Sequence, residues 1–428
     1  MADQYLLPGY YKLIAASITQ YGNLTATDIS GIMHKLVIEE SIDKDSIRGY
    51  LSVIDAVGLL ESTPWRGEER LTIEVEDILK QKKIYDFFIY KIDNVTIKNT
   101  NDALSYDMHF VSYMRWLAGS RKIIKAYNGT IKNTAAEIFE EYYTPKTKEL
   151  IVDETEGILR CVIPNYTPPR AMKFLASRAY SPSSPSCSFR FFENSENFYF
   201  VPDEFLIKQA IKTDNIKEFT FLPAITNTGE FLESQLRNII ELTNTDRINA
   251  VNDLHSGAYR NNPIVVDFVN KTVTDNRYIY QESKNEFAAI NIKSPNIEDI
   301  HTDNFIDYTF TDENERRFLV FKDYQSLGDA PSTIRSEQHL PTIISKSLTY
   351  RHMLYRNTVY AKAYGRLDLK AGDIIKLVVT NFSAKADGAE TETQISGNYI
   401  LHDCTHTFDK ETYEVSMMLT KFDWSKNE

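Results

Sequence analysis

The sequence has 428 residues and a formal charge of −12, from 48 Lys and Arg against 60 Asp and Glu. This length predicts about two to four domains, and a content of 42% apolar and 25% charged residues excludes a disordered or fibrous chain. The negative charge argues against tight binding of nucleic acid, because neutralising phosphates requires clustered Lys and Arg. The 16 glycines are so widely spaced that the glycine-rich nucleotide-binding loops and a G-x-S-x-G nucleophile elbow are excluded.

The cysteine count and the N-terminus bear on the compartment. Three cysteines, Cys161, Cys187 and Cys404, cannot all pair within one chain and form no C-x-x-C motif. This pattern favours free, mostly buried thiols in a reducing environment. Residues 1–20 contain no basic segment followed by an apolar core, so we expect no secretory signal. We also expect no membrane span, because no run approaches the roughly 18 apolar residues that one needs.

Residues 1–116 are predicted to form a first β-rich domain. Short apolar runs occur at 36–38, 50–54, 71–75 and 87–92. The run at 71–75 alternates apolar and polar residues, as a half-buried strand does. A polar loop over 62–69 lies between them and contains Trp65. Trp65 either covers its own loop or is an exposed aromatic anchor at a subunit contact, and it is our candidate interface residue.

Residues 117–223 are predicted to form a mixed α+β domain. Thr134 is a candidate N-cap for a helix over 135–143. Thr167 and Pro168 predict the start of a second helix, with Thr167 as its N-cap. Proline has no backbone N–H, and in the first turn of a helix this group would have no partner within the helix. A hairpin of two short strands is predicted next, at 187–192 and 197–201.

Residues 224–345 are predicted to hold part of a second β-rich domain with a long polar insertion. Helical spacing covers 231–240, and Asn261-Asn262-Pro263 predicts a turn before a strand over 264–269. The polar stretch 282–342 is interpreted as long loops around short elements.

Residues 346–428 are predicted to complete the second β-rich domain, after a helix over 342–357. A turn at 371–373 leads into a strand over 374–379. The chain then closes with a hairpin whose strands cover 399–408 and 413–422. A polar, acidic loop over 382–396 is expected to be mobile. The fold class that follows is α+β, predominantly β, with smaller mixed α/β domains between two β-rich ends.

The most suggestive chemistry lies in His402-Asp403-Cys404-Thr405-His406. On a strand, His402, Cys404 and His406 would share one face and could in principle bind zinc. Same-face neighbours on a strand stand about 7 Å apart, however, so three of them rarely converge on one ion. We therefore predict no metal site and expect this face to pack against a neighbouring element.

The search for other catalytic groups is close to empty. Paired carboxylates occur only as sequence neighbours, such as Glu140 and Glu141, whereas acid/base catalysis needs two carboxyls that face one substrate. The remaining histidines are scattered singly, and none lies in an H-E-x-x-H motif. We predict no catalytic residue, no cofactor and no enzymatic activity.

The order of several short motifs resembles the baseplate hub family of contractile phage tails. The helix start at 167–179, followed by aromatic strands at 189–192 and 197–200, is similar to a segment of that family. Segments similar to T4-type central hub proteins follow at 255–262, 265–267, 369–375, 396–401 and 406–408. Each motif is loose by itself, but together the similar segments extend over nearly the whole chain.

The resemblance implies a structural role. Hub proteins of this family are homotrimers whose subunits each carry two tail-tube-like β-barrel domains, and they resemble the N-terminal part of type VI secretion spike proteins. Six barrels from three chains would match the hexameric ring of the tail tube protein on one face and a trimeric central spike on the other. The implied partners include baseplate wedge proteins and DNA in transit through the channel. The expected location is the virion tail, assembled in the host cytoplasm.

Two features qualify this expectation. The polar stretch 282–342 departs from the family pattern and could be an insertion with its own partner. No lysozyme-like or needle-like segment follows Glu428, so the spike is expected to be a separate chain. The alternatives are a tube-tip or spike-base component of a related injection machine, or a tail-associated cell-wall hydrolase.

Overall fold

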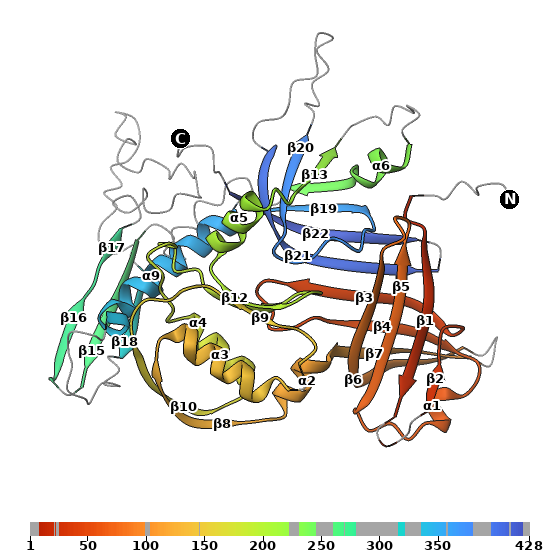
Figure 1. The fold of residues 1–428 in the computed structure, drawn as a ribbon, viewed down its shortest axis with the longest axis horizontal. Helices are drawn as coiled ribbons and strands as arrows, with labels where there is room; N and C mark the ends of the chain where they lie inside the picture. Colours follow the sequence, from red (N-terminus) through yellow and green to blue (C-terminus); the bar gives the residue numbers. More distant parts are fainter. Residues whose placement is uncertain are drawn as a thin grey trace, which may run out of the picture.

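The protein is described by a computed structural model, shown in Figure 1. The residues that the structure describes are 8–20, 22, 25–98, 103–144, 146–221, 231–244, 260–268, 270–279, 316–321, 335–356, 358–379, 395–410 and 412–422. Among them, no helix is both long enough and apolar enough to cross a membrane. The N-terminal strands lie beside the C-terminal strands, and a mixed helical part packs against both (Figure 1).

The N-terminal part is built almost entirely from strands. Its elements are β1 (Tyr11–Thr19), β2 (Ala26–Asp28), β3 (Met33–Ser41), β4 (Arg48–Asp55), α1 (Leu59–Ser62), β5 (Glu69–Asp77), β6 (Lys82–Lys98) and β7 (Ala103–Ser112). All four runs predicted as strands lie within β3, β4, β5 and β6. In β5, Leu71, Ile73 and Val75 are fully buried, so the predicted alternation places the expected face in the core.

The middle part combines helices with short strands. Its elements are α2 (Tyr113–Gly119), β8 (Ile123–Gly129), α3 (Ile131–Tyr142), β9 (Leu150–Val152), β10 (Leu159–Tyr166), α4 (Pro168–Ala176), β11 (Arg190–Glu193), β12 (Phe198–Val201) and α5 (Asp203–Lys212). The predicted helix start at Thr167 and the predicted hairpin are confirmed. The first strand of the hairpin begins only at Arg190, because Cys187 has a left-handed backbone (φ 53°) that a strand cannot adopt.

The predicted cap at Thr134 is wrong. Helix α3 begins one turn earlier, at Ile131, and Thr130 is its N-cap. The Thr130 hydroxyl accepts a hydrogen bond from the Asn133 amide at 3.2 Å, which satisfies a helix-start donor. Thr134 instead donates its hydroxyl to the Thr130 carbonyl at 3.1 Å, as a threonine inside a helix does.

The C-terminal part returns to strands. Its elements are β13 (Ile216–Phe221), α6 (Phe231–Leu236), β14 (Ile239–Asn244), β15 (Arg260–Asp267), β16 (Thr272–Asp275), β17 (Tyr278–Ile279), β18 (Arg316–Phe321), α9 (Arg335–Arg356), β19 (Thr358–Tyr364), β20 (Ile374–Val379), β21 (Gly397–Asp409) and β22 (Tyr413–Phe422). The predicted turn before β20 and the predicted closing hairpin are confirmed. Gly372 in that turn has a φ of +92°, which a glycine adopts without strain.

Three predictions for this part are wrong in detail. The helical spacing over 231–240 holds only to Leu236, because Ile239 already begins a strand that pairs with β19. The expected turn at 261–263 lies inside β15, where Pro263 is paired with Phe318 of β18. Helix α9 starts at Arg335 and includes Pro341, so it extends into the stretch interpreted as loops. The remainder of that stretch and most of the loop at 382–396 lie outside the described residues.

The two β-rich ends of the chain form one continuous sheet. Among the described residues, a 13-stranded sheet runs in the order β14-β19-β22-β21-β3-β4-β7-β6-β5-β1-β2, with β20 paired to β21 and β13 paired to β20. In the part of the chain that the structure describes, the N-terminal and C-terminal strands are joined by the antiparallel pairing of β3 with β21, from Ser41 opposite Asp403 to Lys35 opposite Asp409. We call this pairing the seam. The predominantly β, α+β fold class is thus confirmed, whereas domain boundaries at 116, 223 and 345 stay predictions.

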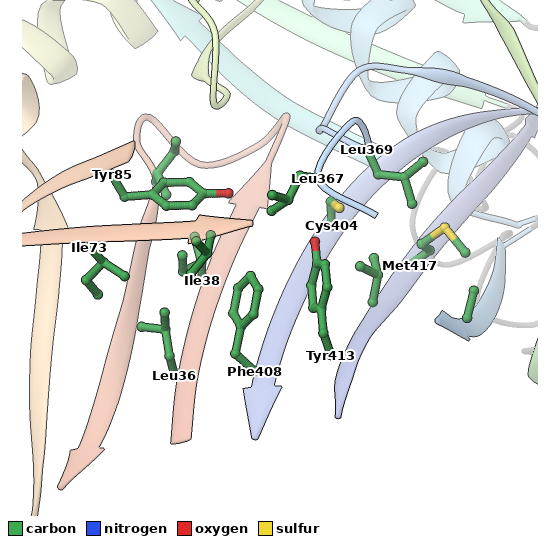
Figure 2. Close-up of a cluster of buried hydrophobic side chains, with 14 of the residues drawn as sticks. Leu36, Ile38, Ile73, Tyr85, Leu367, Leu369, Cys404, Phe408, Tyr413 and Met417 are labelled. Carbon is green, nitrogen blue, oxygen red and sulfur yellow. The ribbon is translucent and has the colours of Figure 1, made fainter. Parts of the chain in front are cut away.

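Side chains from both halves pack in one core across the seam. Leu36 and Ile38 of β3 lie beside Phe408 of β21 and Tyr413 of β22, and all four are fully buried (Figure 2). The Phe408 ring stacks on Tyr413 with centroids 4.1 Å apart. A second core fills the middle part, and a third joins the middle part to both halves through residues such as Ile42, Phe192 and Ile400.

We predict that the seam core stabilises the whole chain. Replacing buried Phe408 by Ala should lower the free energy of unfolding by about 3–5 kcal/mol, because it leaves a cavity beside Tyr413. Replacing Phe268, whose side chain is 68% exposed, by Ala should cost less than about 1 kcal/mol. Chemical denaturation measures both changes. Equal, small losses in the two variants would show that the seam contributes little.

Candidate functional site

Strand β21, which carries the histidine motif, changes partners at His402. Residues Gly397 to Ile400 pair with β20, and residues from Asp403 onward pair with β3 along the same edge. The pairing with β22 shifts register between Leu401 and Asp403, so His402 occupies a bulge. The bulge takes His402 out of the two-residue alternation that Cys404 and His406 still follow.

Cys404 and His406 are buried within the seam core. The Cys404 Sγ lies 3.4 Å from His406 Nε2, and His406 Nδ1 lies 2.7 Å from the Tyr413 hydroxyl. Burial lowers the pKa of His406 to about 3 and raises the pKa of the Cys404 thiol, so both are neutral at physiological pH. Across the described residues, no three side chains of metal-ligating types come together. Cys404 and His406 thus pack in the core as we expected, but the prediction that His402 shares their face is wrong, because the bulge directs His402 to Tyr355 and Asp43.

His402 belongs to a cluster of charged and polar side chains where the three parts of the chain meet. We call Asp43, Arg190, Asp203, Tyr355 and His402 the junction cluster. Asp43 follows β3, Arg190 and Asp203 come from β11 and α5 of the middle part, and Tyr355 and His402 come from α9 and β21. The cluster therefore connects segments up to 359 positions apart, counting from 43 to 402.

Arg190 is the centre of this cluster. Its guanidinium is almost fully buried and donates to both carboxylate oxygens of Asp203, at 2.7 and 3.0 Å. It also donates to Asp43 and, at 3.3 Å, to the Tyr355 hydroxyl. This planar, forked geometry suits arginine, because one guanidinium can satisfy several acceptors at once.

His402 completes the cluster through both ring nitrogens. Its Nε2 lies 2.6 Å from the Tyr355 hydroxyl and 3.3 Å from Asp43 Oδ2, and its Nδ1 lies 3.0 Å from Asp403 Oδ1. Burial lowers the pKa of His402, but the hydrogen bonds to Asp403 and Asp43 outweigh it and the net shift is upward. Burial likewise opposes ionisation of Asp43, yet the hydrogen bond to His402 and the charge of Arg190 lower its pKa.

A second buried carboxylate fixes the middle part to the N-terminal strands. Glu193, at the end of β11, accepts hydrogen bonds from the Lys148 ammonium at 2.7 Å and the Ser112 hydroxyl at 2.5 Å. It also accepts from the backbone amide of Ile47 at 3.3 Å. These groups pair with one another inside the protein, so their chemistry holds parts of the chain together.

Trp65, the predicted interface residue, lies in the loop before β5. Its indole N–H donates to the Leu60 carbonyl at 3.2 Å, and the half-buried ring packs against the large core. These contacts are those of a side chain that covers its own loop. Its role in a subunit contact stays a prediction.

Sequence reasoning missed most of the junction cluster. One signal was available: Arg190 precedes two phenylalanines in an apolar strand, where an unpaired charge would be costly. The partners could not be found in the same way, because ordinary aspartates and tyrosines occur throughout the chain. The predicted family segment at 255–259 lies outside the described residues.

Comparison with known proteins identifies the fold. The sequence matches no family model and no curated protein. The structure is similar to the tail protein from Neisseria meningitidis MC58, with a TM-score of 0.52, 10% identity and 96% of each chain covered. It is also similar to the 43 kDa tail protein of prophage MuSo2 from Shewanella oneidensis, with a TM-score of 0.51, 10% identity and 95% of this chain and 98% of that chain covered.

A weaker likeness extends to a component of the type VI secretion system of E. coli, with a TM-score of 0.45, 9% identity and 97% of this chain and 77% of that chain covered. That score is too low to support an argument. The two stronger likenesses show that this chain has the fold of tail proteins over nearly its whole length. They confirm, at the level of fold, the resemblance found in the sequence.

We predict that the two buried histidines affect stability with opposite pH dependence. The pKa of His402 is raised above its unfolded value of about 6.5, so its stabilisation is complete below that pH and is lost as the pH rises through the folded pKa. The pKa of His406 is lowered to about 3 in the folded state. Below a pH of about 6.5, His406 is therefore protonated in the unfolded state but not in the folded state, so the free energy of unfolding decreases as the pH decreases.

The variants His402→Gln and His406→Gln separate the two effects when the free energy of unfolding is measured from pH 4 to 9. The advantage of the wild type over H402Q should shrink by about 1–3 kcal/mol as the pH rises from 6 to 9. Its advantage over H406Q should shrink as the pH falls from 7 to 4. Differences between proteins are compared because other groups, such as buried Glu40, titrate as well. A pH-independent difference for H402Q would contradict a charged His402.

We also predict that Arg190 stabilises the fold far more than an exposed arginine of the same geometry. Arg190→Met should cost about 3–5 kcal/mol, because Asp203 would remain buried without its partner. The double variant with Asp203→Asn should recover part of this loss. The matched control is Arg70→Met: Arg70 also binds a carboxylate, Asp86, through two nitrogens, but its side chain is 47% exposed, so we expect less than about 1 kcal/mol. Equal losses of the free energy of unfolding in the two arginine variants would contradict a special stabilising role of Arg190 in the junction cluster.

Proposed function

We propose that this chain is the structural hub of the baseplate of a contractile phage tail. Three copies would form an adaptor between the hexameric tail tube and the trimeric central spike, around a channel for DNA. The observation that carries the proposal is the seam: within a tail-protein fold, one chain joins an N-terminal and a C-terminal set of strands into one sheet.

The two sets of strands are of matching size. Six strands on one side of the seam follow the order β3-β4-β7-β6-β5-β1, to which the three-residue β2 is added. The six on the other side are β21, β22, β19, β14, β20 and β13. In this second set, the Thr220 amide of β13 donates to the Arg237 carbonyl, just before β14, at 2.9 Å. That contact supports the proposal that the second set curls into a tube-like barrel, and we propose the same for the first.

The proposed mechanism depends on symmetry. A closed ring can meet another ring only when the number and spacing of their contact surfaces agree. Two barrels in each of three chains give six similar surfaces toward the tube, while the trimer itself retains three toward the spike. The same chain would then solve the mismatch between sixfold and threefold symmetry without a second protein.

We propose a structural role without catalysis. The titratable groups that the fold brings together, in the junction cluster and at Glu193, are mostly buried and bind one another. These contacts hold segments of the chain together, as a structural role requires. The proposed partners are the tube protein, the spike and the baseplate wedges, and the proposed location is the virion tail after assembly in the host cytoplasm. The trimer would carry 3 × −12 = −36 charges, and acidic residues facing the channel would keep DNA from binding as it passes.

The proposal predicts a stable trimer in solution. Light scattering of the purified chain should give about 148 kDa, which is three times 49.4 kDa. Electron microscopy of that species should show a ring with a central channel. Incubation with bacterial cell wall in a zymogram should give no clearing. A monomer at micromolar concentration, or clearing of the cell wall, would argue against the hub.

A further inference from the structure

The outer face of the two-stranded sheet of β8 and β10 carries a group of exposed apolar side chains. Its inner face is buried, with Ile123, Tyr127 and Ile163 in the core of the middle part. On the outer face, Ile124 is 75% exposed and Val162 is 59% exposed. Ala126 lies opposite Val162 and Pro164 lies opposite Ile124 in the strand register, and both are exposed as well. We call these four outer residues, Ile124, Ala126, Val162 and Pro164, the ribbon face.

Parts of the exposed face of the N-terminal sheet carry paired polar groups, although single apolar side chains such as Ile97 are exposed there too. On the N-terminal sheet, Arg70 binds Asp86 through two hydrogen bonds, and the Ser52 hydroxyl donates to Asp107 at 2.5 Å. A sheet face in water normally has such a polar surface. A contiguous apolar face on a sheet of only two strands is instead typical of a surface covered by a partner.

The surroundings of the ribbon face indicate the charge of that partner. Lys122 lies just before β8. Arg160 lies at the start of β10 on the same face as Val162, where it donates to the side-chain oxygen of Asn128 at 3.3 Å, so the polar groups of this face lie at its end. Within these two described strands, no acidic side chain lies on the outer face. The ribbon face is therefore apolar with basic ends, and it fits a partly apolar surface with acidic ends.

The C-terminal sheet of the same chain has a surface of that kind. A groove of about 370 Å³ crosses β14, β19, β22 and β21. Tyr360, which is 46% exposed, and Met418 are cross-strand neighbours in its floor. Glu241 and Asp403 lie at opposite ends, and the Lys362 ammonium in the lining is 2.7 Å from Glu414. The groove is thus partly apolar and acidic at its ends.

We propose that the ribbon face of one chain docks into this groove of a second copy. The contact joins two different surfaces, which is what a closed ring of three identical chains requires. A net charge of −12 per chain makes a second copy repulsive overall, so a local basic-to-acidic match would orient the subunits. The inference rests on the proposed trimer and adds the surfaces that form it.

The first test introduces a charge into the ribbon face. Ile124→Glu should shift the mass from about 148 kDa to 49.4 kDa at micromolar concentration, since it places a carboxylate against the acidic groove. The matched control is Ile97→Glu, because Ile97 of β6 is similarly exposed, at 72%, but lies outside both surfaces. An unchanged circular dichroism spectrum and a cooperative thermal transition would show that I124E still folds, even if loss of the trimer lowers its melting temperature.

The second test exchanges charges between the two surfaces. Arg160→Glu and Glu241→Lys should each raise the trimer dissociation constant by about tenfold, and the double variant should restore most of the affinity. If the wild type is a trimer and I124E, or the pair of charge variants, leaves it intact, the docking inference is wrong while the hub proposal stands. The docking inference is also wrong, and the hub proposal again stands, if I124E remains a trimer and loses only its binding to a tube or wedge protein. A monomeric wild type would overturn both.

Discussion

The antiparallel pairing of β3 with β21 is the interaction on which the rest of the structure depends. It joins strands from opposite ends of the chain, and its register is fixed because a shift of one residue would turn Leu36 and Phe408 out of the core. Without it, the N-terminal and C-terminal strands would be two separate sheets with open edges. With it, they form one surface in which each half has a defined orientation.

The clusters around Arg190 and Glu193 have a different task. A buried ion pair adds little net stability compared with apolar packing, because both charges lose their hydration. Its value lies in geometry, since a displaced partner would leave a charge buried and unpaired. Asp203 fixes the guanidinium of Arg190 within the middle part, and Asp43 and Tyr355 reach it from outside, so these contacts help to fix the position of the middle part relative to the seam. For the proposed hub, which would join rings of different symmetry, such fixed geometry is the property that matters.

The sequence predicted local elements well and their partners poorly. The alternation in β5, the proline at the start of α4 and the closing hairpin are local patterns, and each produced the expected element. The turn expected at Asn261-Asn262-Pro263 failed because pairing with β18 outweighed turn propensity. Cys404 and His406 were assigned correctly to a packed strand face, but His402 was not, because the bulge that directs it to Asp43 has no local signal.

By itself, the sequence determined the fold class, the main strands, the absence of familiar catalytic motifs and a resemblance to tail hub proteins. These follow from local periodicity, from composition and from the order of short motifs, all of which can be identified without knowing which distant residues are in contact. Only the tertiary structure decided that the two β-rich ends share one sheet, and that Arg190 and His402 lie together. Those contacts join residues hundreds of positions apart, and their free energy depends on which side chains the complete fold buries together.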